Sequence, residues 1–376
     1  MTKARDIASA TTPNANAALL ATFPHRNIII NGAMQVAQRG TSYSQSPNSG
    51  NYHTVDRFSY RRTGAWSGVT AVALSQESSG APSGFTHFLR YAPTGSDSST
   101  PSDTSMYIDA KLEGNSVSSL ALGTSAAKSF TISFYVRSSV TGTFCISVQN
   151  GEPTLTKRSY VAEYTIDSAN TWEQKELTVD APTSGTFATD TSIGLALAFI
   201  VSADSSSSTY STSTVGSWLS STDVRWSSNQ SDVVTTSANQ TFDITGIQLE
   251  LGDTATPFEH RSYGDELARC QRYFEKSYSD STAPGTITIT GVIRFRAASS
   301  SVEFPLSFLV KKRSAPTVTL YSYATGASGN IRDISAGSDG AAAVASIGEI
   351  WCFPSKNTSG SDGNQYAIHF TADAEL

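Results

Sequence analysis

The sequence predicts an all-β protein with an extended N-terminal arm, a jelly-roll β-sandwich, one short helix and a small C-terminal antiparallel β domain. Short runs of β-forming residues recur along most of the chain, separated by Gly, Ser and Pro turn signals. In one run Phe130, Ile132, Phe134 and Val136 alternate with other residues, the period of a strand with one buried face. Helical periodicity is almost absent. Together these observations indicate a sandwich or jelly roll.

Composition narrows the possible functions. The net charge of −6 argues against a protein that coats nucleic acid, because such binding needs a basic stripe. Ser and Thr together number 104, while only 15% of residues are charged, so hydroxyl groups keep much of the surface wet. No apolar stretch is long enough for a membrane helix, and we expect no membrane insertion. Cys145, Cys270 and Cys352 indicate neither a disulfide framework nor a zinc site.

The chain divides into four predicted parts. Residues 1–26 are rich in Ala, Thr and Asn without a sustained period, and we expect an extended arm that orders only on a partner. Residues 27–261 carry the strands of the jelly roll. Within them, residues 203–239 break the strand rhythm but contain aromatic side chains, which predicts a long loop that folds against the sandwich. Residues 262–278 form a linking helix, and residues 279–376 form a small antiparallel β domain.

The predicted helix covers residues 262–276. Ser262 begins a pattern that resembles a capping box, with acidic residues in the first turn. Leu267, Cys270 and Phe274 fall at i, i+3 and i+7 and form one apolar stripe. Two interpretations stay open: the stripe packs on its own chain, or it forms a short seam between copies in a homotrimer.

The sequence contains no recognisable catalytic constellation. It has no phosphate-binding Gly-rich loop, no HExxH motif and no Gly-x-Ser-x-Gly elbow. The acidic residues of the first domain have no spacing that separates a catalytic pair from solvated surface acids. We therefore expect no enzyme. Asp243 and Glu250, near the last strand of the jelly roll, are the candidate ligands for a structural Ca²⁺, and no other cofactor is expected.

Binding fits the residues better than catalysis. Aromatic faces pack on sugar rings, while Asn, Gln, Ser and Asp supply directional hydrogen bonds to sugar hydroxyls. Tyr210, Trp218 and Trp226 lie among such residues in the irregular segment, and they are the candidates for glycan binding. The alternative is that these rings pack in the core or on a strand face.

Several stretches resemble proteins of bacterial viruses. The opening MTKARDIA is similar to the start of many phage tail-fibre proteins, where it belongs to the part attached to the particle. NIIINGAMQVAQRGTSY at 27–43, YHTVDRF at 52–58, STVGSW, and the long motif at 245–278 resemble phage and prophage virion proteins with a jelly-roll domain of carbohydrate-binding-module type. The matched residues are Asn31, Gly32, Gln38, Arg39, Gly40, Asp56, Arg57, Gln248, Glu250, Gly252, Phe258, Glu259, His260 and Arg261.

The resemblance implies a virion structural component. Asp56, Arg57, Glu259 and Arg261 would then be framework residues, or alternatively an ion-pair network at a subunit boundary. Residues 1–26 would attach to another tail, baseplate or adaptor protein of the phage.

The leading hypothesis is a homotrimeric tail fibre or receptor-binding protein that attaches to host surface polysaccharide. It would be assembled in the host cytoplasm, located in the virion tail and extracellular after release, with the C-terminal domain as a possible host-facing tip. The first alternative is a head-fibre, decoration or baseplate protein without a receptor role. The second, less favoured alternative is a polysaccharide depolymerase.

Overall fold

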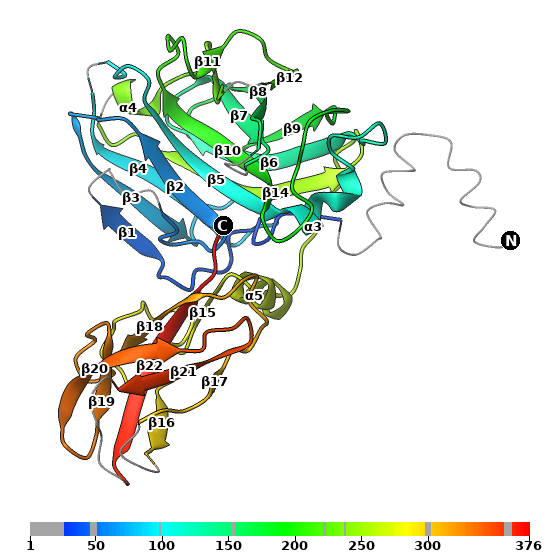
Figure 1. The fold of residues 1–376 in the computed structure, drawn as a ribbon. Coiled ribbons are helices and arrows are strands. Elements are labelled where there is room, and N and C mark those ends of the chain that lie inside the picture. Colours follow the sequence, from blue (N-terminus) through cyan, green and yellow to red (C-terminus); the bar gives the residue numbers. More distant parts are fainter. Residues whose placement is uncertain are drawn as a thin grey trace, which may run out of the picture. The chain divides into compact units, whose positions relative to one another are not determined.

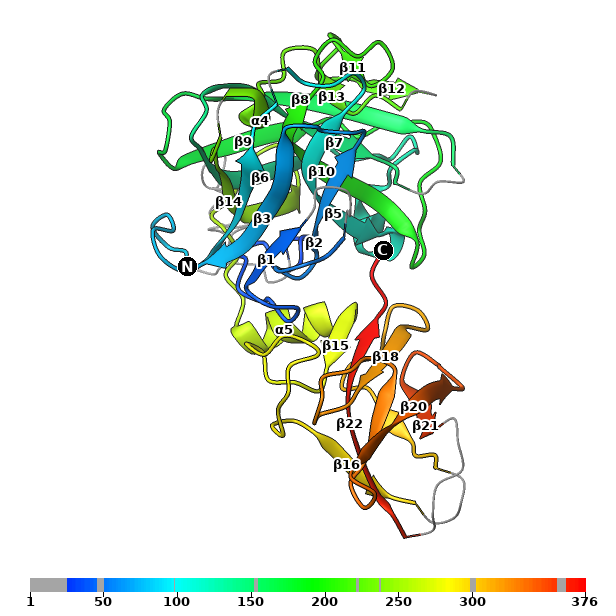
Figure 2. The same cartoon turned by 90° about the vertical axis from the view of Figure 1, so that its left-hand side faces the viewer.

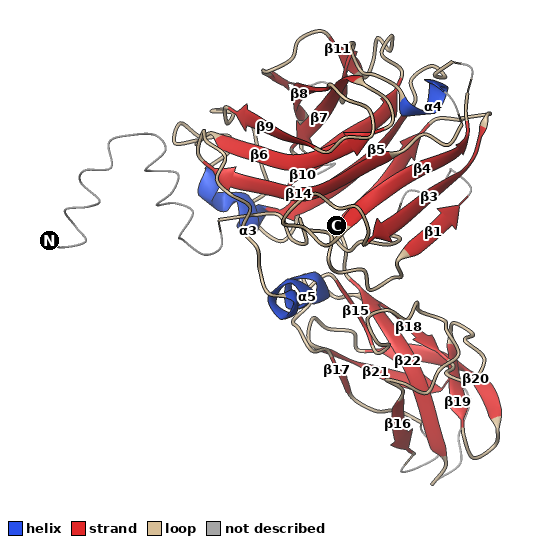
Figure 3. Ribbon diagram, turned by 180° about the vertical axis from the view of Figure 1, so that it is seen from behind, coloured by secondary structure: helices blue, strands red, loops and turns tan. Residues whose placement is uncertain are grey.

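The fold is given by a computed structural model that is nearly all β, with few short helices, and this confirms the predicted fold class (Figure 3). It describes residues 26–45, 51–97, 99–151, 155–220, 223–236, 238–297, 302–356 and 363–376. Apart from Arg26, the predicted N-terminal arm lies outside the described residues. The chain forms two compact units. Unit 1 takes the described residues of Met1–Met34, Ser44–Asn51 and Ser59–Arg261, and unit 2 takes Gln35–Tyr43, Tyr52–Phe58 and Ser262–Leu376.

Unit 1 is built around two six-stranded sheets (Figure 1). Sheet A has the order β1 (Ser42–Gln45), β3 (Val69–Glu77), β4 (Phe88–Gly95), β14 (Phe242–Leu251), β6 (Phe130–Ser138) and β9 (Glu173–Val179). Sheet B has the order β12 (Trp218–Ser220), β8 (Arg158–Ile166), β7 (Gly142–Gln149), β10 (Ile193–Ala203), β5 (Ser105–Glu113) and β2 (Phe58–Thr63). The chain crosses between the sheets from β5 to β6, from β6 to β7, from β8 to β9 and from β9 to β10, as in a jelly roll.

The core of unit 1 lies between the two sheets. Phe130, Ile132, Phe134 and Val136 on β6 are all fully buried, as expected for the apolar face of this strand. The intervening Thr131 and Ser133 are buried too, so burial alternates only toward the end of the strand. The ring of Phe134 meets that of Phe199 on β10 edge to face, with 5.1 Å between the centroids. Removal of these apolar side chains from water is the main driving force for closing the sandwich.

The irregular segment folds onto the outer face of sheet B. It contributes β12, which pairs with β8, and a two-stranded parallel ladder of β11 (Ser211–Thr212) and β13 (Trp226–Ser227). Beneath it lies a separate apolar cluster whose buried members are Cys145, Val161, Ile200, Ala203, Val224 and Trp226. This confirms the prediction that residues 203–239 fold against the sandwich. The helical turns of unit 1 are α3 (Gly114–Val117), η1 (Ser118–Leu120) and α4 (Val233–Thr236).

Unit 2 combines one helix with a curled sheet around its last strand (Figure 2). The described strands of unit 2 are β15 (Phe274–Lys276), β16 (Ile293–Arg296), β17 (Leu306–Ser307), β18 (Thr317–Tyr321), β19 (Asn330–Asp333), β20 (Ser338–Ala345), β21 (Trp351–Lys356) and β22 (Gln365–Asp373). The last of them, β22, pairs with β15, β16, β18 and β19. Leu320, Ile331, Tyr366 and Ile368 belong to the unit's own buried core.

The helix of unit 2 is shorter than predicted. It is α5 (Tyr263–Gln271), and the Ser262 side chain accepts a hydrogen bond from the backbone N–H of Asp265, so the predicted cap is confirmed. The residues after it leave the helix because Phe274 and Lys276 pair with β22 as part of β15. Tertiary strand pairing therefore overrides the helical pattern in the last predicted turn.

The apolar stripe of this helix packs within the single chain. Cys270 is fully buried and Phe274 is 4% exposed, while Leu267 is half-buried. Cys270 and Phe274 therefore offer no free surface for a seam between copies, which supports the first of the two interpretations of this stripe.

Candidate functional site

The strongest candidate site is a groove on the outer face of sheet B. Strand β10 runs between β5 and β7, and Ala198 lies in register with Asp109 on one side and Ser147 on the other. On the next rung Ala196 lies between Lys111 and Gln149. Because side chains alternate across a strand, the residues between these positions point into the core. The two alanines form a low floor, and the polar side chains on β5 and β7 rise on both sides of it.

We call this hollow the sheet B groove, and its volume is about 240 Å³. Its lining comes from β2, β5, β7, β10, the connection between β7 and β8, and the irregular segment. The lining residues are Arg61, Tyr107, Asp109, Lys111, Ser147, Gln149, Gly151, Lys157, Ala196, Ala198, Ile200 and Arg225. Hydroxyl, amide and charged groups thus converge on one strip of a rigid sheet.

Ser147 has the most informative position in the groove. It is 2% exposed, and its Oγ has no hydrogen-bond partner among the described residues. A buried hydroxyl without a partner costs roughly 1–3 kcal/mol. Its neighbour Gln149 is tied down, because Nε2 donates to Ser159 Oγ at 3.0 Å and to the Val224 carbonyl at 2.9 Å. The lining of the groove therefore includes a buried polar group that no described residue satisfies.

The irregular segment contributes one wall of the groove through Arg225. Its guanidinium donates to both carboxylate oxygens of Asp223, at 3.2 and 2.9 Å, and lies 5.7 Å from the ring centre of Tyr210. Nη1 also reaches Tyr107 Oη at 3.5 Å. Burial lowers the pKa of Arg225, but the hydrogen bonds to Asp223 and the electrostatic effects of Tyr107, Asp223 and Tyr210 together raise it above its usual value. Burial raises the pKa of Tyr107. Both groups keep their protons at neutral pH.

The three aromatic candidates have different surroundings. Trp226 is 1% exposed and donates from Nε1 to the Asp204 carbonyl at 2.7 Å, so its ring is core packing and offers no face to a sugar. Tyr210 is half-buried, 5.5 Å from Trp226, and it supports Arg225. Trp218 is half-buried on β12, and its Nε1 donates to the Asp180 carbonyl at 2.7 Å. Tyr210 therefore lies behind Arg225, and none of the three aromatic candidates is among the residues that line the groove.

A second hollow, of about 480 Å³, lies on sheet A. Phe85, Phe258 and His260 line it, and their ring centres are 4.9 to 5.3 Å apart. Gly246, at a φ of 63°, allows Phe85 to approach the strand, since a Cβ there would come within 2.6 Å of that ring. These rings contact one another and hold the segment after β14, so we assign them to the framework.

Asp243 and Glu250 do not fit a calcium site. Asp243 accepts hydrogen bonds from Arg90 at 2.8 and 2.9 Å and from Arg137 at 2.8 Å, and two adjacent guanidinium groups repel a cation. Both oxygens of Glu250 accept from Thr256, at 2.8 and 2.6 Å. Across the described ranges, no group of three or more His, Cys, Asp or Glu residues is placed to hold a metal ion.

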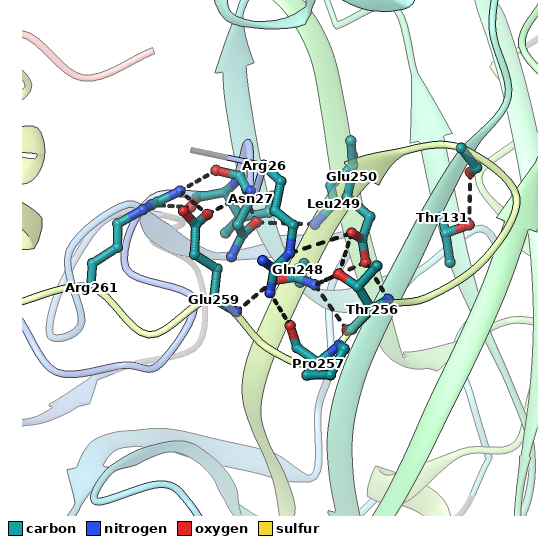
Figure 4. A network of polar contacts seen from close by, with 12 residues as sticks. Arg26, Asn27, Thr131, Gln248, Leu249, Glu250, Thr256, Pro257, Glu259 and Arg261 are labelled. Carbon is teal, nitrogen blue, oxygen red and sulfur yellow. Dashed lines mark hydrogen bonds and ion pairs between the residues drawn. The ribbon is translucent and has the colours of Figure 1, made fainter. Parts of the chain in front are cut away.

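Glu259 and Arg261 belong to a polar network that joins the segment after β14 to residues 27–29 (Figure 4). Glu259 accepts from the backbone N–H of Asn27 at 2.7 Å and lies 3.2 Å from Arg261. Arg261 also donates to the Ile29 carbonyl at 3.1 Å and to the Asn27 carbonyl. These contacts support the framework interpretation of this pair.

Asp56 and Arg57 belong to a network within unit 2. Arg57 pairs with Glu375, and its guanidinium lies 3.4 Å from the ring centre of Tyr273. Asp56 lies 3.8 Å from Arg39, which also pairs with Glu375 at 3.4 Å. The network therefore connects residues 56–57 to Glu375 near the end of the chain. The sequence motif at 52–58 does not reveal this partner.

Most groove residues were not found from the sequence. A signal for them exists in the stretch SMYIDAKLE, where Tyr107, Asp109 and Lys111 alternate with Met106 and Ile108, which are fully buried. Alternation of this kind marks a polar outer face on an otherwise buried strand. What the sequence lacks is the register that places β5, β10 and β7 side by side.

Comparisons with known proteins give no family assignment. No protein-family model matches the chain, and no curated protein matches its sequence. Among the described residues, no helix is long and apolar enough to cross a membrane.

Several solved structures show partial structural similarity. One is the enzymatically active domain of tailspike protein 4 of bacteriophage CBA120, with 11% identity and a TM-score of 0.32 over 61% of this chain and 22% of that one. Another is a putative sugar-binding protein from Bacteroides thetaiotaomicron, with 8% identity and a TM-score of 0.35 over 60% and 99% of the chains. A third is a family 11 carbohydrate-binding module from Clostridium thermocellum, with 11% identity and a TM-score of 0.27 over 58% and 99%. At these TM-scores the similarity carries no argument about function.

Proposed function

We propose that this protein binds polysaccharide in the sheet B groove. The observation that carries the proposal is the buried hydroxyl of Ser147, which lines the groove without a hydrogen-bond partner among the described residues. Sugar hydroxyls both donate and accept hydrogen bonds, so neighbouring sugar units of one polysaccharide chain can engage Ser147, Gln149 and Tyr107. The strands hold these groups in place before a ligand arrives, which lowers the entropic cost of binding.

Binding without hydrolysis is part of the proposal. Glycosidases use two carboxyl groups roughly 5–9.5 Å apart on either side of the scissile bond. Asp109 is the one carboxylate among the described lining residues, and it already accepts from Ser59 and lies 3.9 Å from Arg61. This arrangement supports a binding protein over a depolymerase.

The proposed setting is a phage particle. Its support is the resemblance of the motifs at 27–43, 52–58 and 245–278 to virion proteins. We propose a tail fibre or receptor-binding protein in the virion tail, attached through residues 1–26 to another tail, baseplate or adaptor protein. The alternative is a head-fibre, decoration or baseplate protein without a receptor role. Immunogold images of the particle separate the two, since a tail fibre is labelled at the tail.

A homotrimer is the proposed assembly. Three linked copies would raise the effective concentration of weak glycan sites without any new contact. Light scattering on the full chain should then give a mass of about three times 39.8 kDa. A stable monomer at micromolar concentration would contradict the trimer and leave the groove proposal untouched.

Ser147→Ala tests the groove directly. On an array of neutral and acidic bacterial oligosaccharides, the wild-type chain should retain at least one glycan, and the variant should retain it roughly five-fold more weakly, as loss of one hydrogen bond predicts. The free energy of unfolding should stay unchanged or rise by about 1 kcal/mol, because the variant removes an unsatisfied buried hydroxyl. Weaker binding combined with undiminished stability is the signature of a ligand-binding group.

Ser202→Ala is the matched control. Ser202 is also fully buried, on β10, but its Oγ accepts from the backbone N–H groups of Val233 and Val234 at 3.1 Å each. Its removal should lower the free energy of unfolding by about 1–2 kcal/mol and leave glycan retention per folded molecule unchanged. Wild-type retention by Ser147→Ala, or no retained glycan at all, would refute the proposed function.

A further inference from the structure

We propose that the sheet B groove selects an anionic polysaccharide, whose sugar units carry a carboxylate or phosphate group. This inference rests on the proposed function and names its ligand class. The chain as a whole carries a formal charge of −6, yet the groove lining contains four cationic side chains and one carboxylate. The cationic residues are Arg61, Lys111, Lys157 and Arg225. Positive charge is therefore concentrated in one concave strip of an acidic protein.

The four cations reach the groove from four separate segments. Arg61 lies on β2, Lys111 on β5, Lys157 directly before β8, and Arg225 directly before β13. They do not follow one another in sequence, so their convergence is produced by the fold. In a concave site lined by one sign of charge, the field is focused on an approaching ligand of opposite sign.

Nearby acids offset only part of this charge. Asp109 lies 3.9 Å from Arg61, and Asp223 forms a bidentate pair with Arg225. Lys157 forms no ion pair with any described residue within 4.0 Å, and it is half-buried at the rim of the groove.

Arg225 is fixed in position before a ligand binds. Asp223 holds Nε and Nη2, the Tyr210 ring lies beside the guanidinium, and Tyr107 Oη lies 3.5 Å from Nη1. Nη1 therefore retains a donor for a ligand oxygen, since a guanidinium has five N–H groups. Charge-assisted hydrogen bonds to carboxylate or phosphate are about twice as strong as neutral ones. In the same groove, the hydroxyl of Ser147 can bind a sugar hydroxyl, so the groove matches a charged sugar better than a free ion.

The test compares ligands that differ only in charge. We would titrate the full chain calorimetrically with tetragalacturonate, with its methyl ester and with a glycerol phosphate oligomer. The acid carries carboxylates on the same sugar ring that the ester presents without charge. At least one anionic probe should bind, the acid should bind at least ten-fold more tightly than the ester if carboxylate is the recognised group, and affinity should fall between 50 and 300 mM salt as charges are screened. Binding of the phosphate oligomer alone would assign the charge to phosphate.

The protein variants alter one charge at a time. Lys157→Ala should weaken binding of the anionic probe by roughly three- to ten-fold, and Lys157→Glu should weaken it further, because the reversed charge repels the ligand. Lys128→Ala is the control, since Lys128 is an exposed lysine of the same unit that does not line the groove. It should bind like the wild type. Unchanged binding by Lys157→Glu would overturn the proposal.

Failure of this inference differs from failure of the proposed function. Measurable binding of the acid and the ester with equal affinity, or rejection of both anionic probes by a protein that retains neutral oligosaccharides on the array, overturns the charge assignment and leaves polysaccharide binding in place. Retention of no glycan, charged or neutral, overturns both.

Discussion

Asp56 shows how burial decides the charge of a single residue. It is fully buried, and this raises its pKa to about 6, although Arg39 and the hydrogen bonds from Gln38 act in the opposite direction. Glu375, a further acid of the same network, adds to the increase. In the unfolded chain an aspartate has a pKa of about 3.9.

This difference predicts a pH dependence of stability. Between pH 4 and pH 6 the folded chain binds more protons at Asp56 than the unfolded chain does, so stability falls as pH rises through this range. The contribution of Asp56 is complete below about pH 4 and lost above about pH 6, and it is on the order of 2–3 kcal/mol. Urea denaturation of the wild type and of Asp56→Asn should therefore give curves that diverge between these pH values.

The control for this prediction is Asp253→Asn, at an exposed aspartate of unit 1. It should keep the wild-type pH profile. If Asp56→Asn and the wild type lose stability in parallel from pH 4 to pH 6, or if the carboxyl carbon of Asp56 titrates near pH 4 by NMR, the raised pKa is refuted.

For single residues, the sequence indicated which side chains take part in polar contacts more readily than it indicated their partners or their burial. It singled out Asp56 and Arg57, but their partners Arg39 and Glu375 are separated from one another by most of the chain. It also named Trp226 for glycan stacking, and this ring is in the core because β13 packs over the Cys145 side of sheet B. Nothing in the local pattern distinguishes a core tryptophan from an exposed one.

Elements were predictable where local chemistry determines them. The buried apolar face of β6 and the Ser262 cap of α5 are both set by residues close together in sequence, and both are confirmed. The predicted end of α5 was wrong by five residues, because Phe274 pairs with Asp373, a partner nearly 100 residues later. The sheet B groove was missed for the same reason. Its floor is formed across three paired strands, and Ala198 can be recognised as a groove residue only when the register places Asp109 and Ser147 beside it.

For the whole molecule, the sequence predicted the fold class and the two-part β organisation. The predicted jelly-roll domain was one continuous segment, 27–261, whereas the structure assigns Gln35–Tyr43 and Tyr52–Phe58 to unit 2. These segments bring Arg39 onto the ring of Phe274, 3.7 Å from its centre, and Gln38 Nε2 onto the Phe274 carbonyl at 2.8 Å. Unit 2 is thus completed by residues that precede most of unit 1 in the chain.

This interleaving predicts that the C-terminal part does not fold well alone. A fragment of residues 262–376 lacks Arg39 and Arg57, which cover the rings of Phe274 and Tyr273 and pair with the chain terminus. A second fragment, with residues 35–58 joined to 262–376 by a Gly/Ser linker, restores both cations. The joined fragment should be more stable by roughly 3 kcal/mol or more, since about two aromatic side chains regain their burial.

Urea denaturation followed by circular dichroism measures the difference between the two fragments. A version of the joined fragment with Arg39→Ala and Arg57→Ala controls for the added length, and its stability should fall back toward that of 262–376. Equal unfolding midpoints for 262–376 and the joined fragment would mean that residues 35–58 contribute no stability to unit 2. In that case the boundary between the units would follow the chain at residue 262, because the early segments would be lying on a domain already complete without them.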